Sequence, residues 1–320
     1  QGRSLWILDD LSLLHQLSEA KNKDNFIYKP KDAYRMGGRS NSKSLTTGTN
    51  HPSGVLTYFN VANSDAKEIT LSYLTKQGDT IKSFTTKGTK EKNNKLEVEN
   101  GSNVHSWNMR GDGAERLKGM ILWWGSTAAP MAVPGEYEVV LTVDDESYAK
   151  PFTIIPDGNS ETDLAGMQRQ FDFITDVNST VDKAHKSIKK IRKINSQLEA
   201  FQKQYKEDEG IKDLVEKAKK LQESFSEIEK ALYQTKNKSG QDPLNFPIRL
   251  TNKLAHLNSL VGMDDFPPTQ QDVAVKDELS RQINVELIKF DQLISEEISA
   301  FNTAFNQKKL KYLFVGDDKK

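Results

Sequence analysis

The chain of 320 residues is long enough for two domains of ordinary size, and its 45 basic residues balance 45 acidic ones. Zero net charge provides no overall field that would hold DNA, RNA or an anionic membrane, so we expect no nucleic-acid partner. The absence of cysteine excludes disulfides, thiolate catalysis and cysteine-ligated zinc, but it does not fix the cellular compartment. No apolar stretch approaches the ~18 residues that span a bilayer, so no membrane-spanning segment is expected.

The first expected element is a strand that includes the apolar run from Leu5 to Leu8. The acidic pair Asp9-Asp10 follows it directly. Two carboxylates that are adjacent in a strand point to opposite faces, whereas the other acidic pairs of the chain lie where turns and helix starts favour aspartate. We assign residues 1–50 to this strand and a linker.

Residues 51–157 show the period-two alternation of half-buried strands. Turn residues such as Gln77-Gly78-Asp79 and Pro134-Gly135 separate the segments. Short strands with no helix between them are typical of an immunoglobulin-like antiparallel β-sandwich, and we expect Trp107 and Tyr137 in its core. The expected strands are residues 54–61, 68–75, 80–86, 103–109, 136–143 and 148–155.

Residues 158–320 change to the three- and four-residue spacing of amphipathic helices. A first helix of about 40 residues begins near Asp163, and Gly210 with its acidic neighbours reverses the chain into a second. A third covers residues 248–261, and a fourth begins after Pro267-Pro268. Together they predict an antiparallel four-helix bundle. The apolar seams of its first two helices are Ile174, Val177, Val181, Ala184, Ile188, Ile191, Leu198 and Phe201, and Ile211, Leu214, Ala218, Leu221, Phe225, Ile228 and Leu232.

No catalytic, metal-ligating or cofactor-binding residue can be assigned from sequence motifs. The sequence has no G-x-S-x-G, phosphate-binding loop or dinucleotide-binding motif. His185 lies near the seam of the first long helix, where a packed histidine is the simplest interpretation. None of the histidines has the i, i+4 spacing of a helical metal pair, and they are His15, His51, His105, His185 and His256.

Three further motifs have both a structural and a functional interpretation. The basic run KSIKKIRK, residues 186–193, is typical of a solvated helix face, although a polyanion or phospholipid contact is the alternative. The tripeptide RGD, residues 110–112, resembles an integrin-binding motif but here follows a strand. Trp123 and Trp124 cannot both enter one sheet face, so we expect one of them to be exposed or docked on a neighbour. A contact between domains is favoured over a sugar-stacking platform.

The opening GRSLWILDD resembles the closing strand of the last blade in bacterial sortilin-like β-propeller proteins, a family often labelled glycosyl hydrolase with bacterial-neuraminidase (BNR) repeats. DAYRM at residues 32–36 and HPSGVLTYF at 51–59 resemble its linker and first sandwich strand. SWNMR at 106–110 and VPGEYEVVLTV at 133–143 resemble an immunoglobulin-like domain of the flagellar hook-cap type. The helical tail is similar at residues 242–261, 267–271 and 300–302.

This resemblance implies that the chain is the C-terminal region of an exported protein of the Bacteroidetes type, located in the periplasm, on the cell surface or outside the cell. Its first implied partner is the upstream propeller of the same polypeptide, and another envelope protein is a further candidate. Any glycosidase-like surface would belong to that propeller, and no family catalytic residue can be transferred to this sequence. Asp79-Thr80-Ile81 also resembles the acceptor tripeptide for threonine glycosylation in such exported proteins.

Three functional hypotheses follow. The first is a non-catalytic accessory and scaffold region that provides interdomain and partner-binding surface. The second is part of a glycoside hydrolase whose active site lies in the absent propeller, with Asp9 or Asp10 near it. The third is an assembly role in which an exposed helical seam docks a helix of a partner.

Overall fold

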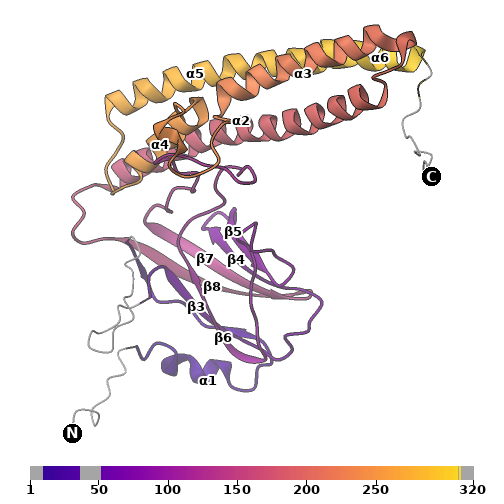
Figure 1. The fold of residues 1–320 in the computed structure, drawn as a ribbon. Coiled ribbons are helices and arrows are strands. Elements are labelled where there is room, and N and C mark those ends of the chain that lie inside the picture. The colour runs from indigo at the N-terminus through magenta and orange to yellow at the C-terminus, as the bar shows by residue number, and fades with distance from the viewer. Residues whose placement is uncertain (1–9, 37–51, 309, 311–320) are drawn as a thin grey trace. The chain divides into compact units, whose positions relative to one another are not determined.

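The computed structural model describes residues 10–36, 52–308 and 310, and the chain divides into two compact units (Figure 1). The β unit contains residues 1–112 and 129–171, and the helical unit contains residues 113–128 and 172–320. The chain therefore combines two β-sheets with long α-helices. The expected strand from Leu5 to Leu8 and the carboxylate of Asp9 lie outside the described residues.

The described strands of the β unit form two sheets (Figure 1). One has the strand order β1-β3-β6 and the other β2-β8-β7-β4-β5. The six strands expected between residues 51 and 157 are present as β3 to β8. The elements are a 3-10 turn (Leu14–Gln16), α1 (Leu17–Ala20), β1 (Phe26–Ile27), β2 (Ala33–Arg35), β3 (Val55–Val61), β4 (Ile69–Thr75), β5 (Thr80–Thr85), β6 (Gly101–Trp107), β7 (Gly135–Val143) and β8 (Glu146–Pro156).

Side chains from both sheets fill one apolar core. Alternate residues of β3 are buried, as the period-two pattern requires. Trp107 is fully buried, its ring stacks on Tyr73 with 4.4 Å between centroids, and its edge meets Phe152. The expected core position of Trp107 is therefore confirmed, whereas Tyr137 packs against this core while only partly buried.

Two short strands depart from the sequence-based expectation. Residues 1–50 are expected to hold a strand and a linker, yet β1 pairs antiparallel with β3, and β2 pairs parallel with β8. The parallel pairing of β2 lies outside the expected sandwich of residues 51–157, whose strands β3 to β8 pair antiparallel. Parallel neighbours need a long connection, which the chain between Arg35 and Glu146 provides. Strands of two and three residues are too short to show a period.

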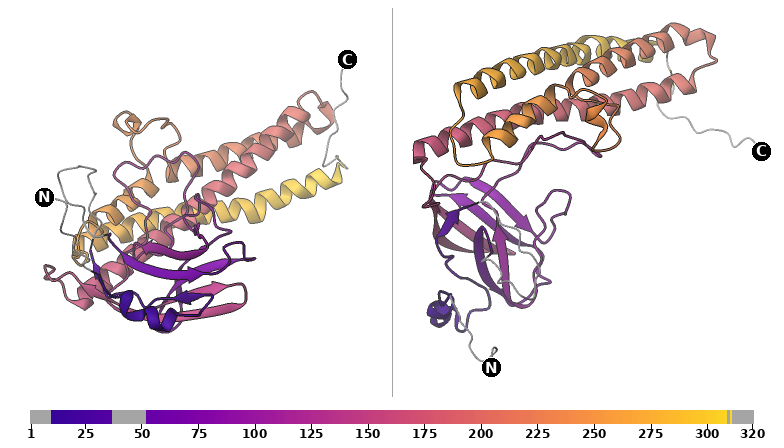
Figure 2. Two further views of the ribbon diagram at one scale, coloured as in Figure 1. Left: turned by 90° about the horizontal axis from the view of Figure 1, so that it is seen from below. Right: turned by 60° about the vertical axis from the view of Figure 1, so that its left-hand side comes forward.

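In the helical unit, α2, α3 and the α5–α6 rod lie side by side (Figures 1 and 2). The pairs Arg192–Glu229 and Gln202–Gln222 show that α2 and α3 run antiparallel. Contacts of Phe201 with Phe301 and of Asp176 with Lys276 show that α5–α6 runs parallel to α2. The bounds are α2 (Leu164–Gln204), a 3-10 turn (Glu209–Ile211), α3 (Lys212–Leu232), a 3-10 turn (Asp242–Leu244), α4 (Leu250–Val261), α5 (Gln270–Gln292), a π-helical segment (Leu293–Ile298) and α6 (Ser299–Gln307).

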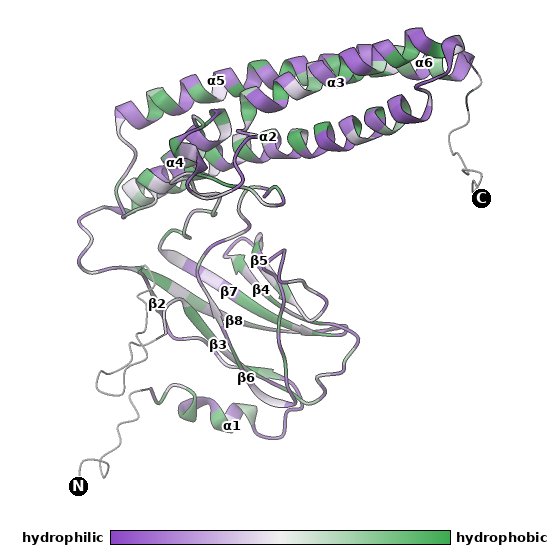
Figure 3. Cartoon of the chain, in the orientation of Figure 1, coloured by the Kyte–Doolittle hydropathy of each residue, from purple (hydrophilic) through white to green (hydrophobic). Residues whose placement is uncertain are grey.

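Nearly all the expected seam residues are buried within the helical unit itself, with Phe201 partly buried against them, and polar and apolar residues alternate around these helices (Figure 3). An exposed seam, which the assembly hypothesis requires, is therefore not found along α2 and α3. The π-helical segment lies where apolar residues recur at two successive steps of four, Phe290, Ile294 and Ile298. A wider turn keeps such residues on one side of the helix.

Candidate binding surface

The segment with the paired tryptophans, residues 113–128, belongs to the helical unit. Ala114 donates its N–H to the Thr127 carbonyl over 2.8 Å and so closes the two ends of the segment against each other. Ser126 donates to the Ala255 carbonyl of α4 over 2.9 Å, and the Leu117 side chain lies in the helical core. The sequence predicts one sandwich over residues 51–157, whereas this stretch packs on helices.

Asn252 of α4 holds the main chain of Trp123 on both sides. The amide oxygen of Asn252 accepts from Trp123 N–H over 2.7 Å, and its Nδ2 donates to the Trp123 carbonyl over 2.8 Å. The Asn252 side chain is buried. Close approach also restricts Gly125, because a Cβ at that position would lie 3.2 Å from the Ala255 Cβ. The backbone of the segment is thus fixed against α4.

The two tryptophans occupy different environments. Trp123 is half-buried, whereas Trp124 is 71% exposed. Trp124 also has a φ of 54°, in the left-handed region that few non-glycine residues adopt. A large aromatic side chain is therefore exposed on a backbone that its neighbours hold in place. The interdomain contact that we expect for one of these tryptophans stays a prediction.

A second set of polar contacts fixes the ends of the segment. Ala128 O accepts from the side-chain amides of Asn178 on α2 and Asn258 on α4, over 2.7 and 2.9 Å. Near the other end, Glu115 N–H donates to the Asp182 carboxylate over 3.0 Å. These partners lie far from the segment in sequence, so they tie it to both helices.

His185 of α2 completes this attachment. Its ring is fully buried, and because the Glu115 carbonyl 2.6 Å away can only accept, Nδ1 carries the proton. Its Nε2 is buried without a hydrogen-bond partner among the described residues. Burial lowers the pKa of His185, and the Glu115 carbonyl opposes this effect. His185 is therefore a neutral imidazole that helps to hold the segment.

Acidification should weaken the helical unit through His185. Its folded-state pKa lies below the unfolded value of about 6.5. The unfolded chain therefore binds more protons between the two values, so stability is retained above about pH 6.5 and is lost as the pH falls below it. Between about pH 7.5 and about pH 5.5 we expect a loss of at most about 1.4 kcal/mol from this residue. Urea unfolding, followed by helical circular dichroism, should show a smaller loss in His185→Asn, which cannot titrate.

Basic residues lie on the tryptophan segment and at the start of α4, the helix that holds it. Arg249 is the N-cap residue of α4, and Lys253 is an exposed residue of α4 next to Asn252. Arg116 and Lys118 lie on the segment itself and are exposed. None of these four Lys and Arg side chains makes an ion pair with another described residue. The segment therefore carries an exposed aromatic ring together with the positive charges of Arg116 and Lys118.

Asp10, the described member of the first acidic pair, borders a pocket of about 550 Å³ in the β unit. Tyr34, Leu56 and Tyr58 contribute to its walls. The Asp10 carboxylate accepts from Ser12 N–H over 2.9 Å and lies 3.7 Å from the Lys31 ammonium. Hydrogen bonding to Ser12, opposed by burial and reinforced by Lys31, lowers the pKa of Asp10. This carboxylate therefore caps a turn beside the pocket in its ionised form.

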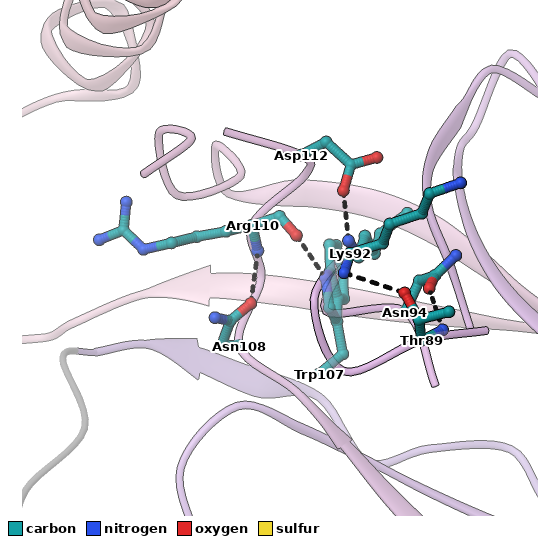
Figure 4. Close-up of polar contacts among 8 residues, drawn as sticks. Thr89, Lys92, Asn94, Trp107, Asn108, Arg110 and Asp112 are labelled. Carbon is teal, nitrogen blue, oxygen red and sulfur yellow. Dashed lines mark hydrogen bonds and ion pairs between the residues drawn. The ribbon is translucent and has the colours of Figure 1, made fainter. Parts of the chain in front are cut away.

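The RGD tripeptide serves the fold of the β unit (Figure 4). Trp107 Nε1 donates to the Arg110 carbonyl over 2.9 Å, and Arg110 Nη1 donates to the Ala129 carbonyl over 2.5 Å. Burial lowers the pKa of Arg110, and the nearby Arg35, also buried, has its pKa lowered to about 10. Asp112 pairs with the buried ammonium of Lys82. The Arg110 side chain is therefore held by the fold, whereas that of Asp112 is 77% exposed while it pairs with Lys82.

The basic run 186–193 has a structural role in the helical unit. Ile188 and Ile191 are fully buried, while Lys186, Lys189 and Arg192 pair with Asp182, Glu115 and Glu229 respectively. In the part of the chain that the structure describes, no three His, Asp or Glu side chains gather as a metal site. No helix there is both long and apolar enough to cross a membrane.

Comparison with known proteins gives little further information. No protein-family model matches the chain, and no curated protein is similar to it. One solved structure, "pT26-6p", is similar at 10% sequence identity over 77% of this chain, with a TM-score of 0.17. The chain spans 48% of the length of that protein.

Proposed function

We propose that this chain is a non-catalytic accessory and scaffold region of an exported sortilin-like β-propeller protein. On this proposal the β unit is an immunoglobulin-like sandwich, the helical unit is a four-helix bundle, and both lie in the cell envelope or outside the cell. The upstream propeller of the same polypeptide is the first partner, and another envelope protein is the second candidate. The order of the sequence motifs supports the family, and the fixed, exposed Trp124 supports the binding role.

The anchoring of Trp124 is the observation that carries the binding role. Its neighbour Trp123 is held by Asn252, and the segment ends are held by Asn178, Asn258 and His185. A side chain on a fixed backbone loses little conformational freedom on binding, and tryptophan is enriched among residues that dominate interface energies. Arg116 and Lys118 of the same segment are exposed and make no ion pair with another described residue, which favours a partner surface with acidic groups.

The test measures binding of the chain to the separately produced propeller part of its polypeptide. Trp124→Ala should weaken the affinity by about 30-fold or more, as expected for a dominant interface residue. Trp124→Tyr is the matched control and should retain most of the affinity. Equal binding of wild type and Trp124→Ala, or no binding of either, would refute this surface.

The second candidate function is participation in a glycoside hydrolase. The observation that favours it is the pocket beside Asp10. In the whole protein, replacing Asp9 and Asp10 by Asn should abolish hydrolysis if these carboxylates act on a substrate. Unchanged hydrolysis would leave Asp10 with the turn-capping role that its contact with Ser12 describes.

A further inference from the structure

The strand β6 forms one edge of the three-stranded sheet. β6 lies at the end of the order β1-β3-β6, and within the described residues no strand pairs with its other edge. Tyr28 N–H donates to the Tyr58 carbonyl, so Tyr58 directs its main-chain groups toward β1. The odd-numbered residues of β3 must then direct their main-chain N–H and C=O groups toward β6. In this register Thr57 lies opposite His105.

It follows that Ser102, Val104 and Ser106 direct their main-chain N–H and C=O groups away from β3. The structure gives these groups no main-chain hydrogen bond with any described residue. All three side chains are exposed, and that of Val104 is 56% exposed. Among the described residues, β6 thus presents a row of donors and acceptors without partners at one side of the sheet.

The β5 edge of the five-stranded sheet, in contrast, is partly protected from pairing with another strand. Beside β5, Thr85 N–H donates to the Asn94 carbonyl and Leu96 N–H donates to the Thr85 carbonyl, so the following segment covers part of this edge. A register shift between Tyr73 and Leu74 interrupts the pairing of β4 with β5. β6 has no charged residue, no proline and an unbroken register with β3. β6 itself therefore lacks three devices that block edge-to-edge pairing, namely charge, proline and a bulge.

We propose that β6 is a self-association edge, where a second copy of this chain adds its own β6 antiparallel with Val104 opposite itself. Ser102 then lies opposite Ser106 of the partner subunit, and the outward N–H and C=O groups of all three residues find partners. The two valines make an apolar contact, and no charge meets a like charge. A short edge buries little area, so the dimer is weak and depends on protein concentration. This inference is independent of the role of Trp124.

The absence of cysteine permits a residue-resolved test on the full chain. Directly opposed residues with outward main-chain groups lie about 5.5 Å apart between Cα atoms, within the range that a disulfide bridges. Val104→Cys should therefore form a cross-linked dimer on oxidation. Ser102→Cys is the matched control: its equivalent in the partner is about 14 Å away, four residues along the strand and one strand spacing across, so it should not cross-link alone. A mixture of Ser102→Cys and Ser106→Cys chains should form the mixed dimer.

Sedimentation of the cysteine-free chain between about 10 μM and about 1 mM gives a second readout. Wild type should show a rising dimer fraction, and Val104→Lys should lower it at least tenfold, because two ammonium groups would meet at the axis. Val104→Thr, which keeps a branched side chain, should associate like wild type. A monomer at every concentration, or equal cross-linking of Val104→Cys and Ser102→Cys, would overturn the proposal.

Discussion

Trp107→Ala is expected to destabilise the β unit by about 3–5 kcal/mol, the cost of removing a large aromatic side chain from a closed core. Trp107 is fully buried, and its ring is stacked on Tyr73 and set edge-on to Phe152. Its Nε1 also satisfies the Arg110 carbonyl, which fixes the turn that follows β6. The midpoint of thermal unfolding should fall by about 6–20 °C, as measured by calorimetry.

The same chemical change at Trp124 provides the matched control. Trp124 is 71% exposed, so Trp124→Ala removes little buried surface and should change stability by about 0.5 kcal/mol or less. Equal losses from the two substitutions would contradict the assignment of Trp107 to the core and of Trp124 to the surface.

Asn252→Leu should have the second large effect, about 2–4 kcal/mol on the helical unit. Leucine has a similar volume but leaves both Trp123 N–H and the Trp123 carbonyl without their partner, and each buried unsatisfied group costs about 1–3 kcal/mol. Urea unfolding followed by helical circular dichroism measures this loss. Tryptophan fluorescence should also become more accessible to acrylamide as the segment detaches.

Lys253→Leu controls for the introduction of leucine in the same turn of α4. Lys253 is exposed and makes no ion pair among the described residues, so its replacement should change stability by about 0.5 kcal/mol or less. If Asn252→Leu and Lys253→Leu lowered the free energy of unfolding equally, the proposed attachment of residues 113–128 to α4 through Asn252 would be contradicted.

Regular elements of the fold could be predicted because each has a period long enough to detect. Alternation in β3 and the three- and four-residue steps of α2 and α3 give strands and helices within a few residues of those observed. β1 and β2 could not be found, because two or three residues carry no period and their pairing depends on partners far along the chain.

The attachment of residues 113–128 could not be predicted for a related reason. The segment has neither period, and its contacts depend on single polar side chains such as Asn178, Asn252 and Asn258. One signal was present. These asparagines lie among the apolar residues of the buried faces of α2 and α4, and a buried amide needs a hydrogen-bond partner. The identity of that partner came only from the fold.

The intact mass of the native polypeptide, with peptide mapping across Gln1, tests most directly the proposal that this chain is an accessory region of a propeller protein. The account predicts a mass well above that of 320 residues, with peptides that run through GRSLWILDD from upstream sequence containing the propeller repeats. A native polypeptide that begins at Gln1, or upstream sequence without propeller repeats, would contradict it.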